Sequence, residues 1–319
     1  FFAMVASHGH GVGQAILDYA LGPGQHPQYH LPTLPNEVAF MQSAFQDLGG
    51  LFGLLIMLLC LLCAAQALLY GLAGHMSHRK AQPSVPSDHG VKHLAVIMDG
   101  NRRYGKHKYG VAAKGHWDGG QTLCDFIDWS MEFGISILTV YAFSTENWNR
   151  EPAEIKVLMS IFQQFSEKIH ATALAKNIRV RFLSSYPDPL PDHIQALVHS
   201  IESSTDHCTA FTLNVCLSYG SRGEIVNACQ SLARQVLQGE LRPEEIDEAR
   251  FGRALLTGGL PDPDLVLRTS GECRVSNYLL YQLAYSELSF LDKPWPAVTR
   301  QDLMDILSHY SRRQRRFGK

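Results

Sequence analysis

Several common signatures are missing from this sequence of 319 residues. It has no GxxxxGK[ST] loop, which disfavours a P-loop kinase or nucleotide hydrolase. It has no GxSxG elbow, which weakens an α/β-hydrolase interpretation. An Asn-x-[Ser/Thr] glycosylation acceptor is also missing, so glycosylation gives no indication of a lumenal domain.

The sequence is also low in charged residues and in cysteine. With 28 basic and 30 acidic side chains, the formal net charge is −2, which argues against a protein that binds nucleic acid over its whole surface. The seven cysteines form no pair of CxxC motifs, so we expect no structural zinc site and free thiols in a reducing compartment. A hydrophobic content of 45% excludes a largely disordered chain.

Residues 48–74 form an apolar run without Asp, Glu, Lys or Arg. The run is long enough to cross a bilayer, and it predicts a transmembrane helix; a buried core helix is the alternative. Because acidic residues precede the run while Arg79 and Lys80 follow it, we expect the C-terminal part in the cytosol. Residues 1–47 are then a poorly ordered lumenal tail, 75–91 a linker and 92–319 one soluble domain.

The soluble domain alternates short β-branched runs with amphipathic stretches. This alternation predicts an α/β fold with a mostly parallel central sheet of about six strands flanked by helices. The expected strands are 93–98, 136–143, 178–183, 211–217, 264–268 and 287–291. The expected helices are 117–133, 152–170, 190–204, 222–238 and 299–313.

Arginine-containing turns follow four of the expected strands. They span residues 99–103, 144–150, 218–223 and 268–274. Each turn alone is consistent with an ordinary surface loop, but the carboxyl ends of parallel strands meet at one edge of a sheet. Guanidinium groups and backbone N–H groups gathered there would bind phosphate oxygens, and Asp99 among them is a natural Mg²⁺ ligand shared with a diphosphate.

Four sequence blocks carry a family resemblance. They read HLAVIMDGNRRYGKHKYGVAAKGHWDGG, TVYAFSTENWNR, LNVCLSYGSRGEIV and DLVLRTSGECRVSNYLLYQLAYSELSF. Together they resemble the cis-prenyltransferases, which include undecaprenyl and dehydrodolichyl diphosphate synthases. No DDxxD motif of the trans-type prenyl synthases occurs. The resemblance implies repeated 1′–4 condensation of isopentenyl diphosphate onto an allylic diphosphate such as farnesyl diphosphate, with a Z double bond at each step.

The resemblance also implies roles for individual residues. Asp99 corresponds to an essential aspartate that binds Mg²⁺ and supports the leaving diphosphate, and Glu287 to a carboxylate that assists the metal. The residues expected around the allylic diphosphate are Gly100, Asn101, Arg102, Arg103, His116 and Arg150. The residues expected at the isopentenyl diphosphate are Arg268, Arg274 and Ser276.

The segment after the second expected strand matches a mobile part of the family site. It contributes Ser144, Glu146 and Asn147, and Asn147 is expected near the step at which the proton is lost. Phe143 and Trp148 match aromatic residues of the substrate channel, although ordinary core packing explains each of them equally well. The residues that the resemblance implies in catalysis are Asp99, Arg103, Ser144 and Asn147.

The C-terminus contains Arg316 and Gly318, which match an RxG motif that reaches across a dimer interface. A basic tail that touches anionic lipid is the alternative. The resemblance thus implies a self-sufficient homodimer, anchored in the endoplasmic reticulum membrane, that makes a long-chain dolichol precursor for protein glycosylation. A non-catalytic accessory subunit like the Nogo-B receptor and a shorter-chain cis-prenyl diphosphate synthase remain as alternatives.

Overall fold

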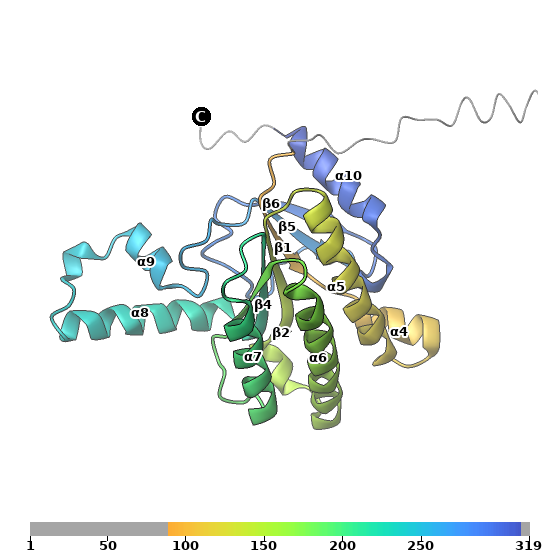
Figure 1. The fold of residues 1–319 in the computed structure, drawn as a ribbon, viewed down its shortest axis with the longest axis horizontal. Coiled ribbons are helices and arrows are strands. Elements are labelled where there is room, and N and C mark those ends of the chain that lie inside the picture. Colours follow the sequence, from red (N-terminus) through yellow and green to blue (C-terminus); the bar gives the residue numbers. More distant parts are fainter. Residues whose placement is uncertain (1–88, 314–319) are drawn as a thin grey trace, which may run out of the picture. The chain divides into compact units, whose positions relative to one another are not determined.

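A parallel sheet of six strands forms the centre of the computed structural model, which describes residues 89–313 (Figure 1). The spatial order of the strands is β3-β4-β2-β1-β5-β6, and every neighbouring pair is parallel. The strands are β1 (His93–Ile97), β2 (Ile137–Ser144), β3 (Ile178–Leu183), β4 (Phe211–Tyr219), β5 (Leu265–Thr269) and β6 (Glu287–Leu291).

Helices connect β1 to β2, β2 to β3, β3 to β4 and β4 to β5, as parallel strands require, whereas a segment without a helix joins β5 to β6. In Figure 1, α5, α6 and α7 stand side by side along the sheet, while α8 and α9 extend away from it. The helices are α4 (Asn101–Tyr109), α5 (Lys114–Glu132), α6 (Pro152–Ala173), α7 (Asp192–Thr205), α8 (Ser221–Leu237), α9 (Glu248–Ala254) and α10 (Arg300–Ser311). Short 3-10 turns are η1 (Thr145–Asn149), η2 (Pro243–Glu245) and η3 (Trp295–Ala297).

The neighbouring interior strands β1 and β5 are buried along their whole length. Because helices cover a parallel sheet on both faces, such strands carry continuous rather than alternating apolar residues. Leu94, Val96 and Leu267 of these strands are fully buried and belong to the largest core cluster. This core fixes the positions of the strand ends, where the polar turns begin.

The predicted α/β fold is confirmed, with expected strands within two residues of the observed ones. The prediction missed α4, because it packs through glycines rather than through an apolar stripe. A Cβ atom at Gly115 would lie 1.9 Å from the Asn101 carbonyl oxygen, and one at Gly105 would lie 2.5 Å from the Gly115 nitrogen. The backbones of α4 and α5 therefore touch directly, and this contact brings Asn101 next to α5.

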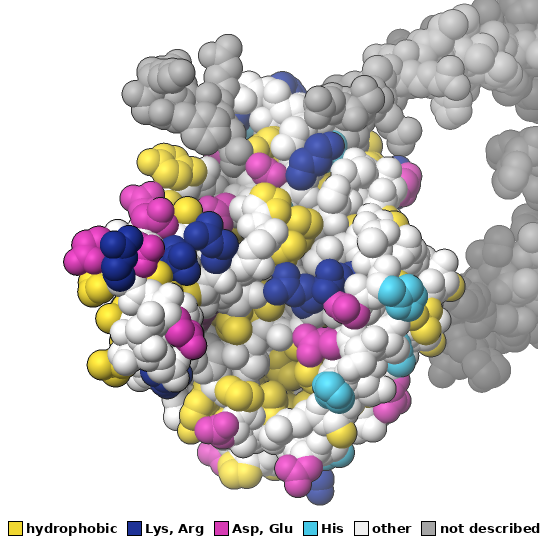
Figure 2. All heavy atoms as spheres, turned by 60° about the vertical axis from the view of Figure 1, so that its left-hand side comes forward, with side chains coloured by type: hydrophobic (Ala, Val, Ile, Leu, Met, Phe, Trp, Pro, Cys, Tyr) yellow, Lys and Arg dark blue, Asp and Glu magenta, His cyan; other side chains and the backbone are white. Residues whose placement is uncertain are grey.

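Within residues 89–313, no helix is long and apolar enough to cross a membrane. The predicted tail (1–47), the predicted transmembrane helix (48–74), all but the last residues of the linker (75–91), and the pair Arg316 and Gly318 lie outside the described residues. On the face shown in Figure 2, Lys and Arg side chains lie beside Asp and Glu side chains, so neither sign of charge dominates there.

Candidate active site

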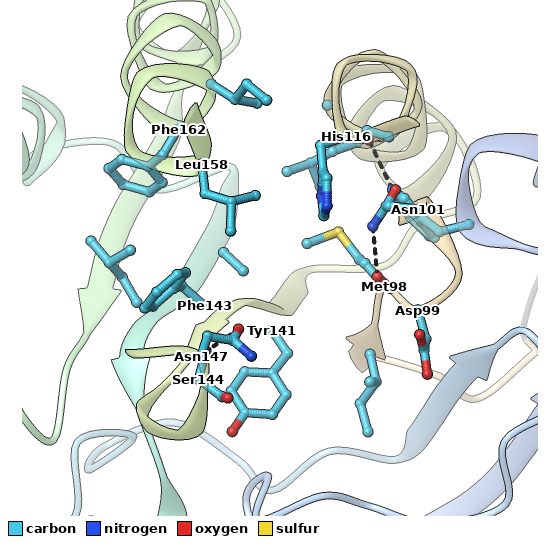
Figure 3. A pocket seen from close by; sticks show the side chains of 18 of the residues that line it. Met98, Asp99, Asn101, His116, Tyr141, Phe143, Ser144, Asn147, Leu158 and Phe162 are labelled. Carbon is cyan, nitrogen blue, oxygen red and sulfur yellow. Dashed lines mark hydrogen bonds between the residues drawn. The ribbon is translucent and has the colours of Figure 1, made fainter. Parts of the chain in front are cut away.

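A cavity of about 880 Å³ opens at the carboxyl ends of the central strands. Asp99 follows β1, Ser144 ends β2 and Arg268 lies near the end of β5, so three of the four predicted turns converge on the cavity, whereas no residue of the turn 218–223 lines it. Figure 3 shows several of these side chains around the opening. The predicted residues that line the cavity are Asp99, Gly100, Asn101, Arg102, Arg103, His116, Phe143, Ser144, Glu146, Asn147, Arg150, Arg268, Arg274 and Ser276.

The Asp99 carboxylate is held at the mouth of this cavity by hydrogen bonds on both oxygens. The Gly100 N–H donates to Oδ1 at 2.6 Å, and Arg268 Nη2 donates to Oδ2 at 2.9 Å. The Thr269 hydroxyl accepts from the Asp99 N–H at 2.9 Å and donates to the Asp99 carbonyl at 2.7 Å. Arg103 lies 3.7 Å from the carboxylate. Asp99 therefore remains in one orientation before any ligand arrives.

Arg268 is the most deeply buried cation of the site, at 4% exposure. Its Nη1 donates to Ser276 Oγ at 2.7 Å and to the Arg274 carbonyl at 2.5 Å, while its buried Nε has no hydrogen-bond partner among the described residues. A guanidinium in this position fixes the turn that carries Arg274 and Ser276. Because a buried cation with a spare donor favours an anionic neighbour, the pocket is suited to a phosphate-bearing ligand.

Glu272 partly neutralises two other arginines at the same edge. It pairs with Arg103 at 3.2 Å and accepts a short hydrogen bond from Arg274. That hydrogen bond and the nearby charge of Arg274 hold the pKa of Glu272 below its usual range. The exposed arginines are thus oriented by Glu272 and remain free to exchange it for ligand oxygens.

His116 lines the cavity together with two further arginines, Arg102 and Arg150. Burial, assisted by the positive charges of Arg150 and Arg102, lowers the pKa of His116 to about 4. Both arginines contact Glu154, at 3.0 Å from Arg150 and 3.5 Å from Arg102. The imidazole is therefore neutral at pH 7, and its buried Nε2 has no partner among the described residues.

The end of β2 turns into η1 and places a polar segment on the cavity wall. The Ser144 N–H donates to Asn147 Oδ1 at 3.0 Å, which fixes the Asn147 carboxamide. Phe143 lines the cavity, and the Trp148 ring meets it edge-on with centroids 4.9 Å apart. Trp148 Nε1 donates to Ser218 Oγ at 2.8 Å. Trp148 therefore supports Phe143 and is not itself part of the cavity wall.

Behind the polar mouth, the cavity is apolar. The helix α6 contributes Leu158, Met159, Phe162 and Phe165 to the wall. At Gly120 of α5, a Cβ atom would lie 2.3 Å from the Phe165 ring, so the missing side chain leaves room for that ring. The cavity thus has the two parts that an amphiphile with an anionic head and a hydrocarbon tail requires.

Glu287 is not brought to this mouth. The register of the sheet pairs Leu94 with Leu265 and Leu265 with Glu287, which places Glu287 at the amino ends of the strands. Asp99 lies five residues beyond Leu94, so about 16 Å of strand separates the two carboxylates at roughly 3.3 Å per residue. Glu287 instead accepts from Arg313 Nη1 at 2.5 Å. Within one chain, therefore, Glu287 shares no metal with Asp99.

Thr269 and Asn277 belong to the site but were missed by the sequence analysis. Thr269 fixes the backbone of Asp99, and Asn277 lines the cavity and donates to Glu146 Oε1 at 2.9 Å. Both residues directly follow a predicted site residue, Arg268 or Ser276. Adjacency within the same strand-end turn was the signal that could have identified them.

The side chains around Asp99 suit a Mg²⁺ ion that is shared with a diphosphate. Among the described residues, no three His, Cys, Asp or Glu side chains gather as a metal cage. Mg²⁺ usually keeps several waters and binds through one or two carboxylates together with substrate phosphates. A single oriented carboxylate beside arginines fits this mode, in which a diphosphate would complete the coordination.

A family model described as putative undecaprenyl diphosphate synthase matches residues 97–318. The chain belongs to this family. The match spans every cavity-lining turn as well as Arg316 and Gly318. Membership, together with the cavity, supports cis-prenyl diphosphate synthase activity for the chain, and it agrees with the sequence resemblance.

Relatives from other organisms cover most of the same region. An isoprenyl transferase of Geobacillus kaustophilus is 43% identical over 226 residues, which are 71% of this chain and 88% of the relative. A tritrans,polycis-undecaprenyl-diphosphate synthase (geranylgeranyl-diphosphate specific) of Thermococcus kodakarensis is 39% identical over 79% of this chain and 100% of the relative. The relatives thus include enzymes from a bacterium and an archaeon.

Two solved structures share the fold. Lavandulyl diphosphate synthase from Lavandula x intermedia, in complex with dimethylallyl diphosphate, superposes with a TM-score of 0.70 at 32% identity and covers 73% of this chain and 100% of its own. A probable undecaprenyl diphosphate synthase from Campylobacter jejuni gives a TM-score of 0.59 at 33% identity, over 72% and 99% of the two chains. The fold is therefore common to synthases named for quite different products.

Proposed function

We propose that the chain condenses isopentenyl diphosphate repeatedly onto farnesyl diphosphate and makes a long-chain Z-polyprenyl diphosphate. The observation that carries this proposal is the cavity, in which an arginine-rich mouth continues into an apolar wall. The mouth suits two diphosphates, and the wall suits a hydrocarbon chain that grows away from them. Holding both reactants in line would supply much of the rate enhancement.

The residues of the cavity mouth would have different roles in binding and orienting the two substrates. Mg²⁺ held by Asp99 would neutralise charge on the leaving diphosphate. Arg268 orients Asp99 and the Ser276 turn through its three hydrogen bonds, and Arg103 and Arg274 would exchange Glu272 for diphosphate oxygens. Neutral His116 would bind the allylic diphosphate as a hydrogen-bond donor, and Asn147 would lie beside the proton-losing carbon.

A long hydrocarbon product would favour a synthase that is anchored in a membrane. Each buried CH₂ favours an apolar environment by about 0.8 kcal/mol, so a growing polyprenyl chain partitions strongly into lipid. The apolar run 48–74 would hold the synthase at the endoplasmic reticulum membrane with its catalytic domain in the cytosol. There the product would become the dolichol precursor for protein glycosylation, made by a homodimer in which Arg316 and Gly318 reach the partner's site.

A second candidate function differs from the first in the length of the product. The structural neighbour from Lavandula x intermedia is named for lavandulyl diphosphate, a short product, although it shares this fold. A shorter-chain cis-prenyl diphosphate synthase is therefore the main alternative. An accessory subunit without activity is disfavoured, because Asp99, Asn101, Arg103 and Arg268 all line the cavity.

The experiment uses the full chain, purified alone in detergent and supplied with farnesyl diphosphate, isopentenyl diphosphate and Mg²⁺. Mass spectrometry of the products should show long polyprenyl diphosphates, which Asp99→Ala and Arg316→Ala should both abolish. Asp128→Ala, which removes only a surface ion pair with Lys176, is the matched control. Short products would favour the second candidate, and no product from folded protein would contradict the self-sufficient homodimer.

A further inference from the structure

Asn277 joins separate segments of the chain at the cavity mouth. Its Oδ1 accepts from the Arg222 N–H at 2.9 Å, and its carbonyl accepts from the Ser221 N–H at 2.8 Å. Its Nδ2 donates to Glu146 Oε1 at 2.9 Å. Ser221 and Arg222 form the first turn of α8, whereas Glu146 lies in η1. One carboxamide thus caps a helix with its oxygen and holds η1 with its nitrogen.

The position of Asn277 is fixed by its neighbours. The next residue, Tyr278, is fully buried, stacks on Tyr141 with centroids 4.6 Å apart and donates to the Thr139 carbonyl at 3.0 Å. At Gly220, a Cβ atom would lie 2.6 Å from Asn277 Nδ2 and 2.6 Å from Thr145 Oγ1. The side chain therefore sits in a tight junction, where only a glycine at position 220 leaves it enough room.

The hydrogen bond to Glu146 has an ionised acceptor. Burial opposes the charge on Glu146, but the hydrogen bond from Asn277 and weaker ones from nearby groups hold the pKa of Glu146 below its usual range. Hydrogen bonds to charged groups are stronger than neutral ones. The contact therefore ties η1, which carries Asn147, to the turn that carries Arg274 and Ser276.

We propose that Asn277 is a positioning residue for catalysis. It fixes the position of the segment 144–150 relative to the turn 274–276, so that the two bound diphosphates are correctly oriented toward each other. The position requires an acceptor for α8 and a donor for Glu146 on the same short side chain, and Asn supplies both. The catalytic part of this inference rests on the proposed function, whereas the mechanical part concerns the chain alone.

Asn277→Asp separates the two contacts. The carboxylate keeps an acceptor for the Arg222 N–H, where a negative charge at a helix N-terminus is favourable, so the fold is retained. It replaces the donor to Glu146 with a second negative oxygen. We expect kcat to fall about tenfold with smaller changes in both KM values, because the segments lose their alignment rather than their own ligand contacts. Amide hydrogen exchange should become faster in residues 144–150 but not in β1 or β5.

A reciprocal exchange provides the rescue. In Glu146→Gln/Asn277→Asp, the amide introduced at position 146 can donate to the carboxylate introduced at position 277, which restores the bond with donor and acceptor reversed. We expect this double variant to recover about fivefold in kcat over Asn277→Asp, a recovery of roughly 1 kcal/mol. Asn177→Asp is the matched control: like Asn277, whose φ is 59°, Asn177 has a positive φ (55°), and its Oδ1 accepts the backbone N–H of Thr209 away from the residues that line the cavity.

Two results would overturn the proposal: unchanged exchange in residues 144–150 of Asn277→Asp, or a double variant less active than Asn277→Asp. Hydrogen exchange requires no substrate, so it tests the junction even if the wild-type chain forms no product. The absence of product would count against the proposed function, whereas an unchanged exchange pattern would count against the role of Asn277.

Discussion

Gly100 combines a positive φ with close packing at the cavity mouth. Its φ is +97°, and its N–H donates to Asp99 Oδ1 at 2.6 Å. A Cβ atom there would lie 2.6 Å from Ser270 Oγ and 2.9 Å from Pro294 Cβ. Gly100→Ala therefore introduces both a strained backbone and a steric clash, and both act directly beside the Asp99 carboxylate.

The size of the effect follows from these two contributions. A left-handed backbone costs a residue with a side chain about 1–2 kcal/mol, and overpacking adds about 1–3 kcal/mol. Gly100→Ala should therefore lower the free energy of unfolding by about 2–5 kcal/mol. Gly134→Ala is the matched control, because Gly134 has a φ of +80° but no atom within 4 Å of an added Cβ. Gly134→Ala should lose only the free energy that the left-handed backbone costs, about 1–2 kcal/mol.

Urea denaturation of the full chain, followed by circular dichroism, measures the stability of both variants, and product formation measures their activity. If the clash moves Asp99 by about 1 Å, kcat should fall roughly a hundredfold in Gly100→Ala and stay near the wild-type value in Gly134→Ala. Equal stability of the two alanine variants, together with equal turnover, would refute the argument that the close approach at Gly100 holds Asp99 in place.

Three further predictions concern other parts of the cavity. Folding lowers the pKa of His116 from 6.5 to about 4, so between these pH values the unfolded chain binds a proton that the folded chain does not. The free energy of unfolding should therefore fall by up to about 3 kcal/mol as the pH drops from 6.5 to about 4. In His116→Gln, denaturation at several pH values should not show this loss of stability. Leu158→Trp fills space in the apolar wall, so mass spectrometry should show shorter products, and any overpacking should lower stability by no more than about 1–3 kcal/mol. Chelation by EDTA should abolish product formation, and added Mg²⁺ should restore it, since Asp99 offers a single carboxylate that fits a diphosphate-bound ion.

The strand ends could be predicted from the sequence because the sheet is parallel. β-branched apolar runs marked β1 and β5, and the next polar residue after such a run lies at the carboxyl edge. This reasoning placed Asp99 and Arg268 at one edge, and the structure joins them by a hydrogen bond of 2.9 Å. The tight packing of α4 on α5 was not predictable in this way, because contacts between backbones leave no apolar periodicity.

The block from Asp264 to Phe290 shows why nearness in sequence is a poor guide beyond a single turn. The chain follows β5 to the carboxyl edge at Arg268, stays there through Asn277, and then returns to begin β6 at Glu287 on the opposite edge. Tyr278 marks where the chain leaves the cavity mouth, because its buried ring and its hydrogen bond to Thr139 draw it into the core. The polar residues from Arg268 to Asn277 therefore lie at the carboxyl edge, whereas Asp264 and Glu287 lie at the amino edge, and a motif match alone cannot make that distinction.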